Sequence, residues 1–208
     1  MRCTSYEDDS KEEFLMAANK KTDTKTLALL SLLTALTAVL AYLGGFVKIG
    51  GLASISLTLI PVVIGSALCG VGAGAWLGGV SGAVFFLTAD AAFWMGLSPF
   101  GTVLTVMVKG IASGLCAGLV YKLVEKTNRY LAVILSAIVC PVVNTSIFIG
   151  GCFVFFMDTI NAGAAAEGMS TWGYLLVFFV GLNFIFELVA NIVLSPVILR
   201  LINIKQGK

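Results

Sequence analysis

Long apolar runs extend from Leu27 to Ile204 and constrain the fold of this sequence more than any other feature. A helix needs roughly 20 apolar residues to cross a hydrocarbon core of about 30 Å, so this stretch has room for about six spans with short connections. Of the 208 residues, 59% are apolar and 12% are charged, whereas soluble domains carry about 25% charged residues. The sequence therefore predicts an all-α membrane protein with six transmembrane helices.

Glycines, prolines and polar breaks indicate where these spans begin and end. The alternating stretch Ser54–Leu59 predicts an extended segment, with a helix starting at Pro61. Because the following apolar run is too long for one span and carries glycines at 70, 72 and 74, we expect a tight hairpin there. Outer connections are expected near residues 90–99 and over 158–171. The predicted spans are 27–43, the two arms of the hairpin within 61–88, 101–123, 130–157 and 172–202.

The distribution of Lys and Arg predicts the orientation. Basic residues gather in the amino-terminal tail, between the fourth and fifth spans, and at the carboxyl-terminal end. Loops rich in Lys and Arg remain cytoplasmic, so both termini are predicted inside. Residues 1–26 then form a cytoplasmic polar tail with an acidic cluster, residues 27–204 the membrane domain, and residues 205–208 a second cytoplasmic tail.

Two series of glycines recur at every fourth position, which places each series on one helix face. The first comprises residues 70, 74, 78 and 82, and the second comprises residues 110, 114 and 118. Small residues at this spacing allow helix backbones to approach closely in a membrane. A phosphate-binding loop at residues 70–74 is a weak alternative, because no Lys-Ser or Lys-Thr follows and the segment is apolar.

Polar residues inside the predicted spans are the strongest candidates for a binding site. Lys109 lies in the fourth span, Asn144 in the fifth, and Asn183 and Glu187 in the sixth. Charged groups within a membrane are costly and mark functional sites by default, so these residues predict a shared polar cavity. In the alternative interpretation, Asn and Glu hold helices together and Lys109 only neutralises Glu187.

Three residues of the outer connections could also contribute to a site. Lys48 and Asp90 could close over a ligand, or could be ordinary solvated loop charges. Trp94 could face a ligand, or could belong to an aromatic belt at the membrane interface.

Several stretches together resemble the substrate-binding (S) components of energy-coupling factor (ECF) transporters. These are Ser54–Pro61 entering a short helix, the glycine-rich hairpin, and Asn144-Thr145 in the fifth span. Residues 98–102 (SPFGT) and 140–145 (CPVVNT) look like the pantothenate branch of that family. The resemblance implies six helices in a prokaryotic cell membrane, a vitamin bound near the outer face, and partners consisting of a membrane-embedded coupling subunit and two ATPases.

The resemblance also implies a docking face on the first helix. In the family this face carries an Ala-x-x-x-Ala pattern, which is absent from the first span here. Two pairs of small residues keep the same spacing, Ser31 with Ala35 and Thr34 with Ala38, and either could dock on the coupling subunit.

Three classes of function remain for such a chain. A vitamin-binding subunit of an ATP-driven importer, for pantothenate or for another vitamin such as riboflavin, requires ATPase partners because this chain has no nucleotide-binding motif. A self-sufficient ion-coupled carrier would transport by itself. An intramembrane enzyme is disfavoured because the sequence has no histidine and no paired-carboxylate motif. No cofactor and no nucleic-acid partner is expected.

Overall fold

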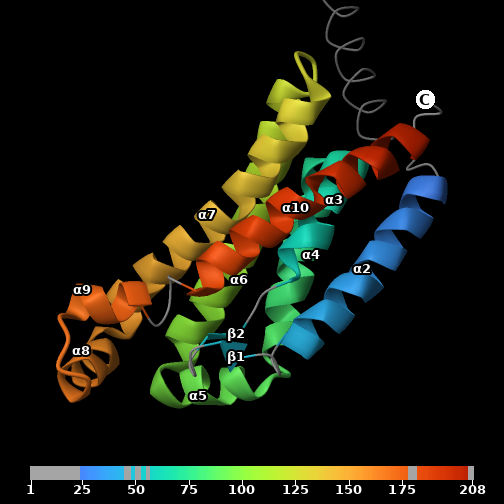
Figure 1. The fold of residues 1–208 in the computed structure, drawn as a ribbon. Coiled ribbons are helices and arrows are strands. Elements are labelled where there is room, and N and C mark those ends of the chain that lie inside the picture. The colour runs from blue at the N-terminus through green and yellow to red at the C-terminus, as the bar shows by residue number, and fades with distance from the viewer. Residues whose placement is uncertain (1–23, 45–47, 50–52, 55–56, 178–181, 206–208) are drawn as a thin grey trace, which may run out of the picture.

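The structure is a computed structural model that describes the backbone of residues 24–44, 48–49, 53–54, 57–177 and 182–205. Within these ranges it is almost entirely helical (Figure 1). The helices are α2 (Thr24–Gly44), α3 (Leu59–Cys69), α4 (Val71–Phe85), α5 (Ala89–Leu97), α6 (Pro99–Val124), α7 (Arg129–Phe155), α8 (Met157–Ala166), α9 (Thr171–Tyr174) and α10 (Leu182–Lys205). Two short strands, β1 (Lys48–Ile49) and β2 (Ala53–Ser54), pair antiparallel.

Three of the described helices are long and apolar enough to cross a membrane, namely α2, α6 and α7. A fourth crossing is possible if α4 and α5, which meet at a bend of 82°, are counted as one broken span. The helix α3 is apolar but has 11 residues, which is shorter than the roughly 20 that a straight span needs. The prediction of a mainly helical membrane protein is confirmed at this level.

The predicted boundaries of three connections need correction. Residues 90–99, expected as a loop, are mostly the helix α5, and residues 158–171 contain the helix α8. Of the predicted sixth span, the structure describes residues 172–177 and α10 from Leu182 onward, and residues 178–181 lie outside the described part. Before α3, the chain is extended at β2 but turns at residues 57 and 58, and the helix begins at Leu59 rather than at Pro61.

Local sequence signals explain where the two longest helices begin. Ser98 caps α6 by accepting a hydrogen bond from the Gly101 backbone N–H at 3.3 Å, and Pro99 is the first helical residue. Asn128 caps α7 by accepting from the N–H groups of Tyr130 and Leu131 at 2.9 and 3.4 Å. These caps satisfy amide groups that would otherwise lack partners at a helix start, and proline at the first position needs no donor.

The hairpin predicted at the glycine-rich segment is confirmed. The helix α3 ends and α4 begins around Gly70, whose φ of +97° is a conformation that L side chains rarely adopt. A glycine at this point allows the chain to reverse within a single residue.

Both glycine series meet along the contact between α4 and α6. The Cα of Gly78 faces the carbonyl of Gly110, and Gly74 faces the carbonyl of Gly114 in the same way. A methyl group added at any of these four positions would overlap the backbone of the opposite helix. The two helices therefore pack backbone against backbone, as the spacing of the glycines predicts.

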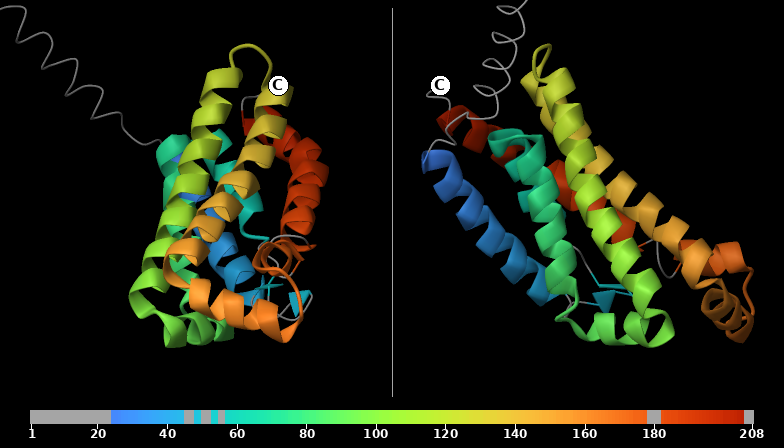
Figure 2. Two further views of the ribbon diagram at one scale, coloured as in Figure 1. Left: turned by 90° about the vertical axis from the view of Figure 1, so that its left-hand side faces the viewer. Right: turned by 180° about the vertical axis from the view of Figure 1, so that it is seen from behind.

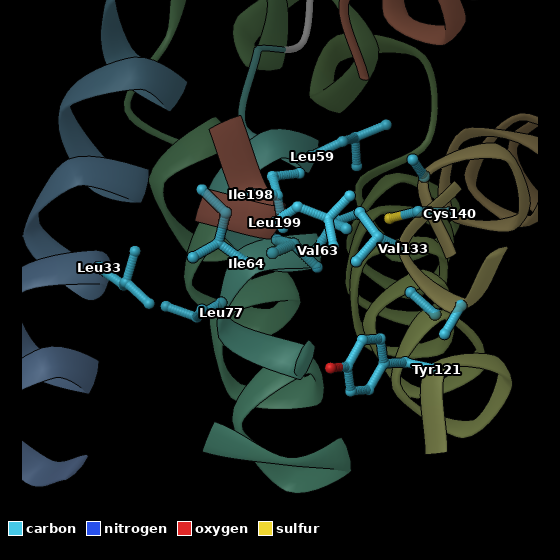
Figure 3. Packing of buried hydrophobic residues seen from close by; sticks show 14 residues of the cluster. Leu33, Leu59, Val63, Ile64, Leu77, Tyr121, Val133, Cys140, Ile198 and Leu199 are labelled. Carbon is cyan, nitrogen blue, oxygen red and sulfur yellow. The ribbon is translucent and has the colours of Figure 1, made fainter. Parts of the chain in front are cut away.

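The main core lies between α3, α4, α6, α7 and α10. Figure 3 shows Val63 of α3, Leu77 of α4, Val133 of α7 and Ile198 of α10 converging, and all four side chains are fully buried. The helix α2 is peripheral. Of its apolar 18-residue stretch, 17% is buried inside the protein, compared with 39% for the corresponding stretches of α6 and of α7. It stands beside α3 and α4 at one side of the bundle (Figure 2).

Different segments of the chain lie at the two ends of the bundle. The start of α2, the connection between α6 and α7, and the end of α10 lie at one end (Figure 1). The strands β1 and β2, α5 and α8 lie at the other end. We call it the hairpin end after the pair β1–β2, not after the α3–α4 turn.

Replacing Gly78 by alanine tests the contact between α4 and α6. The added methyl group would overlap the Gly110 carbonyl, so we expect the free energy of unfolding to fall by at least about 1–3 kcal/mol. Thermal unfolding of the purified protein in detergent measures the effect. Gly72→Ala is the matched control, since nothing lies within 4 Å of the added atom, and there we expect a change within about 0.5 kcal/mol or a small gain. Equal behaviour of the two variants would contradict the packing.

Candidate functional site

A cavity lies among five helices toward the hairpin end of the bundle. Its empty space is about 550 Å³ when the part open to solvent is included. It is lined by the end of α2, the start of α3, the second half of α4 with the connection that follows it, the first half of α6 and the middle of α7. The lining residues are Leu40, Ala41, Gly44, Thr58, Leu59, Ser81, Gly82, Phe85, Thr88, Val106, Lys109, Gly110 and Asn144.

Lys109 supplies a positive charge to this cavity. Its side chain is half-buried and is one of the lining residues. The ammonium nitrogen lies 4.9 Å from the ring centre of Phe148 and 5.9 Å from that of Phe85. An aromatic face attracts a cation by about 0.5–2 kcal/mol, more when water is excluded, so the two rings offset part of the cost of the buried charge.

Asn144 faces the same cavity from α7. It lies almost one turn after Pro141, which α7 accommodates without ending. An amide side chain offers two donors and an acceptor, so Asn144 can bind either a carboxylate or a hydroxyl group. The structure therefore brings together Lys109 and Asn144, as the sequence predicted for two of its candidates.

Two hydroxyl groups, Ser81 of α4 and Thr88 just before α5, add acceptor sites to the cavity. The Ser81 hydroxyl donates to the Gly78 carbonyl at 2.8 Å, and the Thr88 hydroxyl donates to the Phe85 carbonyl at 2.7 Å. Their protons are thus used by backbone carbonyls of α4, which leaves the oxygen lone pairs to accept from a ligand. Sequence reasoning missed both residues, although Ser81 lies one helical turn after Gly78 in α4.

Glu187 is buried in the bundle but does not line the cavity. Its side chain is 1% exposed, and it is not among the lining residues. Asn191, one turn further along α10, donates from its amide to the Glu187 carbonyl at 2.9 Å.

Asp90 and Trp94 occupy α5 and do not line the cavity. Asp90 is 8% exposed and lies in the first turn of α5, where the helix dipole stabilises a negative charge. Trp94 packs edge-on against Phe148 at 5.7 Å and Phe156 at 5.0 Å between ring centres, in a second buried cluster. Its carbonyl accepts from the Thr102 hydroxyl at 2.8 Å, which ties α5 to α6.

The remaining candidates divide into two groups. The side chains of Lys48 and Asn183 lie outside the described part of the structure. On α2, Ser31 and Ala35 are exposed, whereas Thr34 and Ala38 are half-buried. Thr34 accepts a hydrogen bond from the Trp76 indole of α4 at 3.3 Å, so this pair faces the bundle more than the other does.

Comparison with known protein families decides the class of this chain. Residues 25–199 match the family model of the ECF transporter substrate-specific component. The chain belongs to this family. No curated protein and no solved structure matches it. Membership means that the protein is a transport subunit rather than an enzyme, with a small-molecule substrate and the ECF module as its partner.

Lys109→Met tests the cavity as the binding site of this S component. Losing a charge-assisted contact costs about 1.5–3 kcal/mol, so we expect affinity for an acidic substrate to fall roughly ten- to a hundredfold. Asn144→Ala should cost less, about 0.5–1.5 kcal/mol. Isothermal titration measures both. Lys122→Met, in the last turn of α6 and exposed, is the matched control and should bind normally. Unchanged affinity in a stable Lys109→Met protein would remove Lys109 from the site.

Proposed function

We propose that this S component binds a vitamin acid, with pantothenate as the substrate, and delivers it through an ATP-driven importer. The observation that carries the proposal is the pairing of Lys109 and Asn144 in one cavity. A cation beside an amide suits a carboxylate, and the acceptor oxygens of Ser81 and Thr88 suit hydroxyl or amide protons on the same molecule. Pantothenate carries all of these groups.

The lining of the cavity favours a compact acid over a flat ring system such as riboflavin. Phe85 is the one aromatic residue among the lining residues that the structure describes. Large flat ligands are usually stacked between or against aromatic rings. Trp94, the candidate that could have served this purpose, is packed into the core with Phe148 and Phe156.

We also propose six spans with both termini in the cytoplasm. The helices α2, α3, α4 with α5, α6, α7 and α10 would make these spans, with α3 too short to cross unaided. The connection after α6 and the end of α10, which lie opposite the hairpin end, carry Lys126, Arg129 and Arg200. The positive-inside rule then makes the hairpin end the outer one, where a substrate would enter.

A panel of vitamins tests the substrate. Thermal unfolding of the purified chain should shift upward with pantothenate and not with riboflavin, because a ligand that binds only the folded state stabilises it. The free energy of unfolding should rise by about 2.7 kcal/mol at a ligand concentration 100 times Kd. Stabilisation by riboflavin alone would exclude the proposed acid as substrate.

Reconstitution in proteoliposomes tests energy coupling. We expect the purified chain to bind substrate but to accumulate it only when the coupling subunit and the ATPases are added with ATP, since no nucleotide-binding motif is present. The measurement is uptake of radiolabelled pantothenate. Uptake by the chain alone, driven by an ion gradient, would favour the self-sufficient carrier instead.

Ala35→Trp tests docking through the exposed face of α2. Ala35 and Ser31 leave a shallow surface against which another helix can pack closely, and an indole would prevent that approach. We expect loss of complex formation with the coupling subunit, measured by co-purification, and nearly unchanged ligand binding. Val154→Trp, at a position 72% exposed on α7, is the matched control. Loss of ligand binding in Ala35→Trp would show that this face belongs to the core of the fold.

A further inference from the structure

The two aromatic rings beside the Lys109 ammonium both belong to the edge of a larger group of buried side chains. Phe148 lies 4.9 Å and Phe85 lies 5.9 Å from the ammonium nitrogen, measured to the ring centres. Both rings pack against the second buried cluster, which we call the aromatic cluster. Its buried members are Trp94, Cys152, Phe156, Ile160 and Leu175. The support of the cavity cation therefore extends beyond the residues that line the cavity.

Trp94 contacts Phe148 from inside the aromatic cluster. The two rings meet edge-on, with 5.7 Å between their centres and 86° between their planes. Trp94 also meets Phe156 at 5.0 Å and Phe93 at 5.4 Å between ring centres. It is 9% exposed and is not among the lining residues. Because edge-to-face contacts depend on orientation, an indole held in this way restricts how the Phe148 ring can turn.

The backbone at Trp94 is tied to the helix that carries Lys109. The Trp94 carbonyl accepts from the Thr102 hydroxyl at 2.8 Å and from the Ser98 backbone N–H at 3.2 Å. Thr102 is buried in α6, and Lys109 follows it about two helical turns later. The contacts thus run from α6 through α5 and α7 and return to α6 at Lys109.

A lysine ammonium depends on such contacts for its position. Its charge stands at the end of a flexible four-carbon stem, so the backbone alone does not place the nitrogen. The face of an aromatic ring attracts the ammonium and holds it. A cation already held at the cavity wall meets a carboxylate without first losing its freedom of rotation, whereas a mobile one binds the same group at an entropic cost.

We propose that Trp94 positions the Phe148 ring and, through it, the Lys109 ammonium, so that α5 sets the preference of the cavity for acids over neutral molecules. This inference rests on the proposed function of the cavity. Trp94 is a positioning residue that acts from outside the cavity and does not contact the ligand. When its indole is removed, the Phe148 ring gains freedom to turn, and the ammonium loses the fixed place at which it meets a carboxylate.

The experiment compares pantothenate with pantothenol, in which a hydroxymethyl group replaces the carboxylate. Both ligands are titrated by isothermal calorimetry into the purified full-length wild type and into Trp94→Leu, Trp94→Phe and Phe148→Leu. In Trp94→Leu we expect pantothenate to bind roughly three- to tenfold more weakly, the cost of immobilising one long side chain, and pantothenol to change less than about twofold. Trp94→Phe keeps an aromatic edge toward Phe148, so most of the affinity for pantothenate should return.

A double-variant cycle tests whether Trp94 acts through Phe148. Phe148→Leu removes the ring itself, so its loss of pantothenate affinity should be at least as large as that of Trp94→Leu. Adding Trp94→Leu to Phe148→Leu should then cost little more, because both changes remove the same support. Losses that add in the double variant would overturn the inference, since Trp94 would then act by another route.

Trp172→Leu is the matched control, because it is the same substitution at the same end of the bundle (Figure 1). Trp172 of α9 contacts Phe153 of α7 at 5.0 Å between ring centres, and this pair is not part of the contacts that run from Trp94 to Lys109. Both affinities should stay unchanged in this variant. The same change in the ratio of the two affinities as in Trp94→Leu would overturn the inference.

The ratio of the two affinities separates positioning from a purely structural role. A residue that only holds α5 in place would weaken both ligands alike when replaced, so an unchanged ratio in either Trp94→Leu or Phe148→Leu would overturn the inference. If Trp94→Leu cannot be purified, the ratio in Phe148→Leu and the cycle with Trp94→Phe decide by the same criteria. A wild-type protein that does not prefer pantothenate would overturn the proposed acid substrate and this inference together. A wild-type preference that survives in all the variants would overturn this inference alone.

Discussion

Direct backbone contact between α4 and α6 determines where the cavity and its charge lie. Along this contact, the glycines of one helix face carbonyl groups of the other, so no side chain can rearrange to absorb a shift in register. Gly78 is held opposite Gly110, the residue that follows Lys109. The contact opens near Gly82, which lines the cavity together with Gly110. Close packing along most of the two helices and an opening toward the hairpin end thus come from one series of contacts.

A cation in such a cavity is useful because its surroundings hold it in place without satisfying it fully. The rings of Phe85 and Phe148 attract the Lys109 ammonium but cannot neutralise it. Neither ring accepts all of its N–H donors, so donor capacity remains for a ligand. The same two rings offset part of the cost of a charge in the bundle when the cavity is empty.

Sequence reasoning succeeded where one physical constraint dominates and failed where several compete. Length and apolarity are enough to find α2, α6 and α7, and the glycines at 70, 72 and 74 in a run too long for one span are enough to find the turn before α4. The short helices α5 and α8 were expected as connections, because polar and small residues near a membrane surface are compatible with either structure. Trp94 was a candidate ligand contact, yet Phe148 and Phe156 bury it from more than fifty positions away in the chain.

The sequence by itself determined that this is a helical membrane protein, which residues are polar within it, and which helix faces can approach closely. Periodicity and solvent preference act locally, so they can be read along the chain. Only the tertiary structure decided which of the polar candidates line one cavity, that Ser81 and Thr88 join Lys109 and Asn144 there, and that Glu187 is buried without lining it. Those relations depend on the rotation and register of α4, α6, α7 and α10 against one another. Packing between distant segments sets that register, and no local pattern records it.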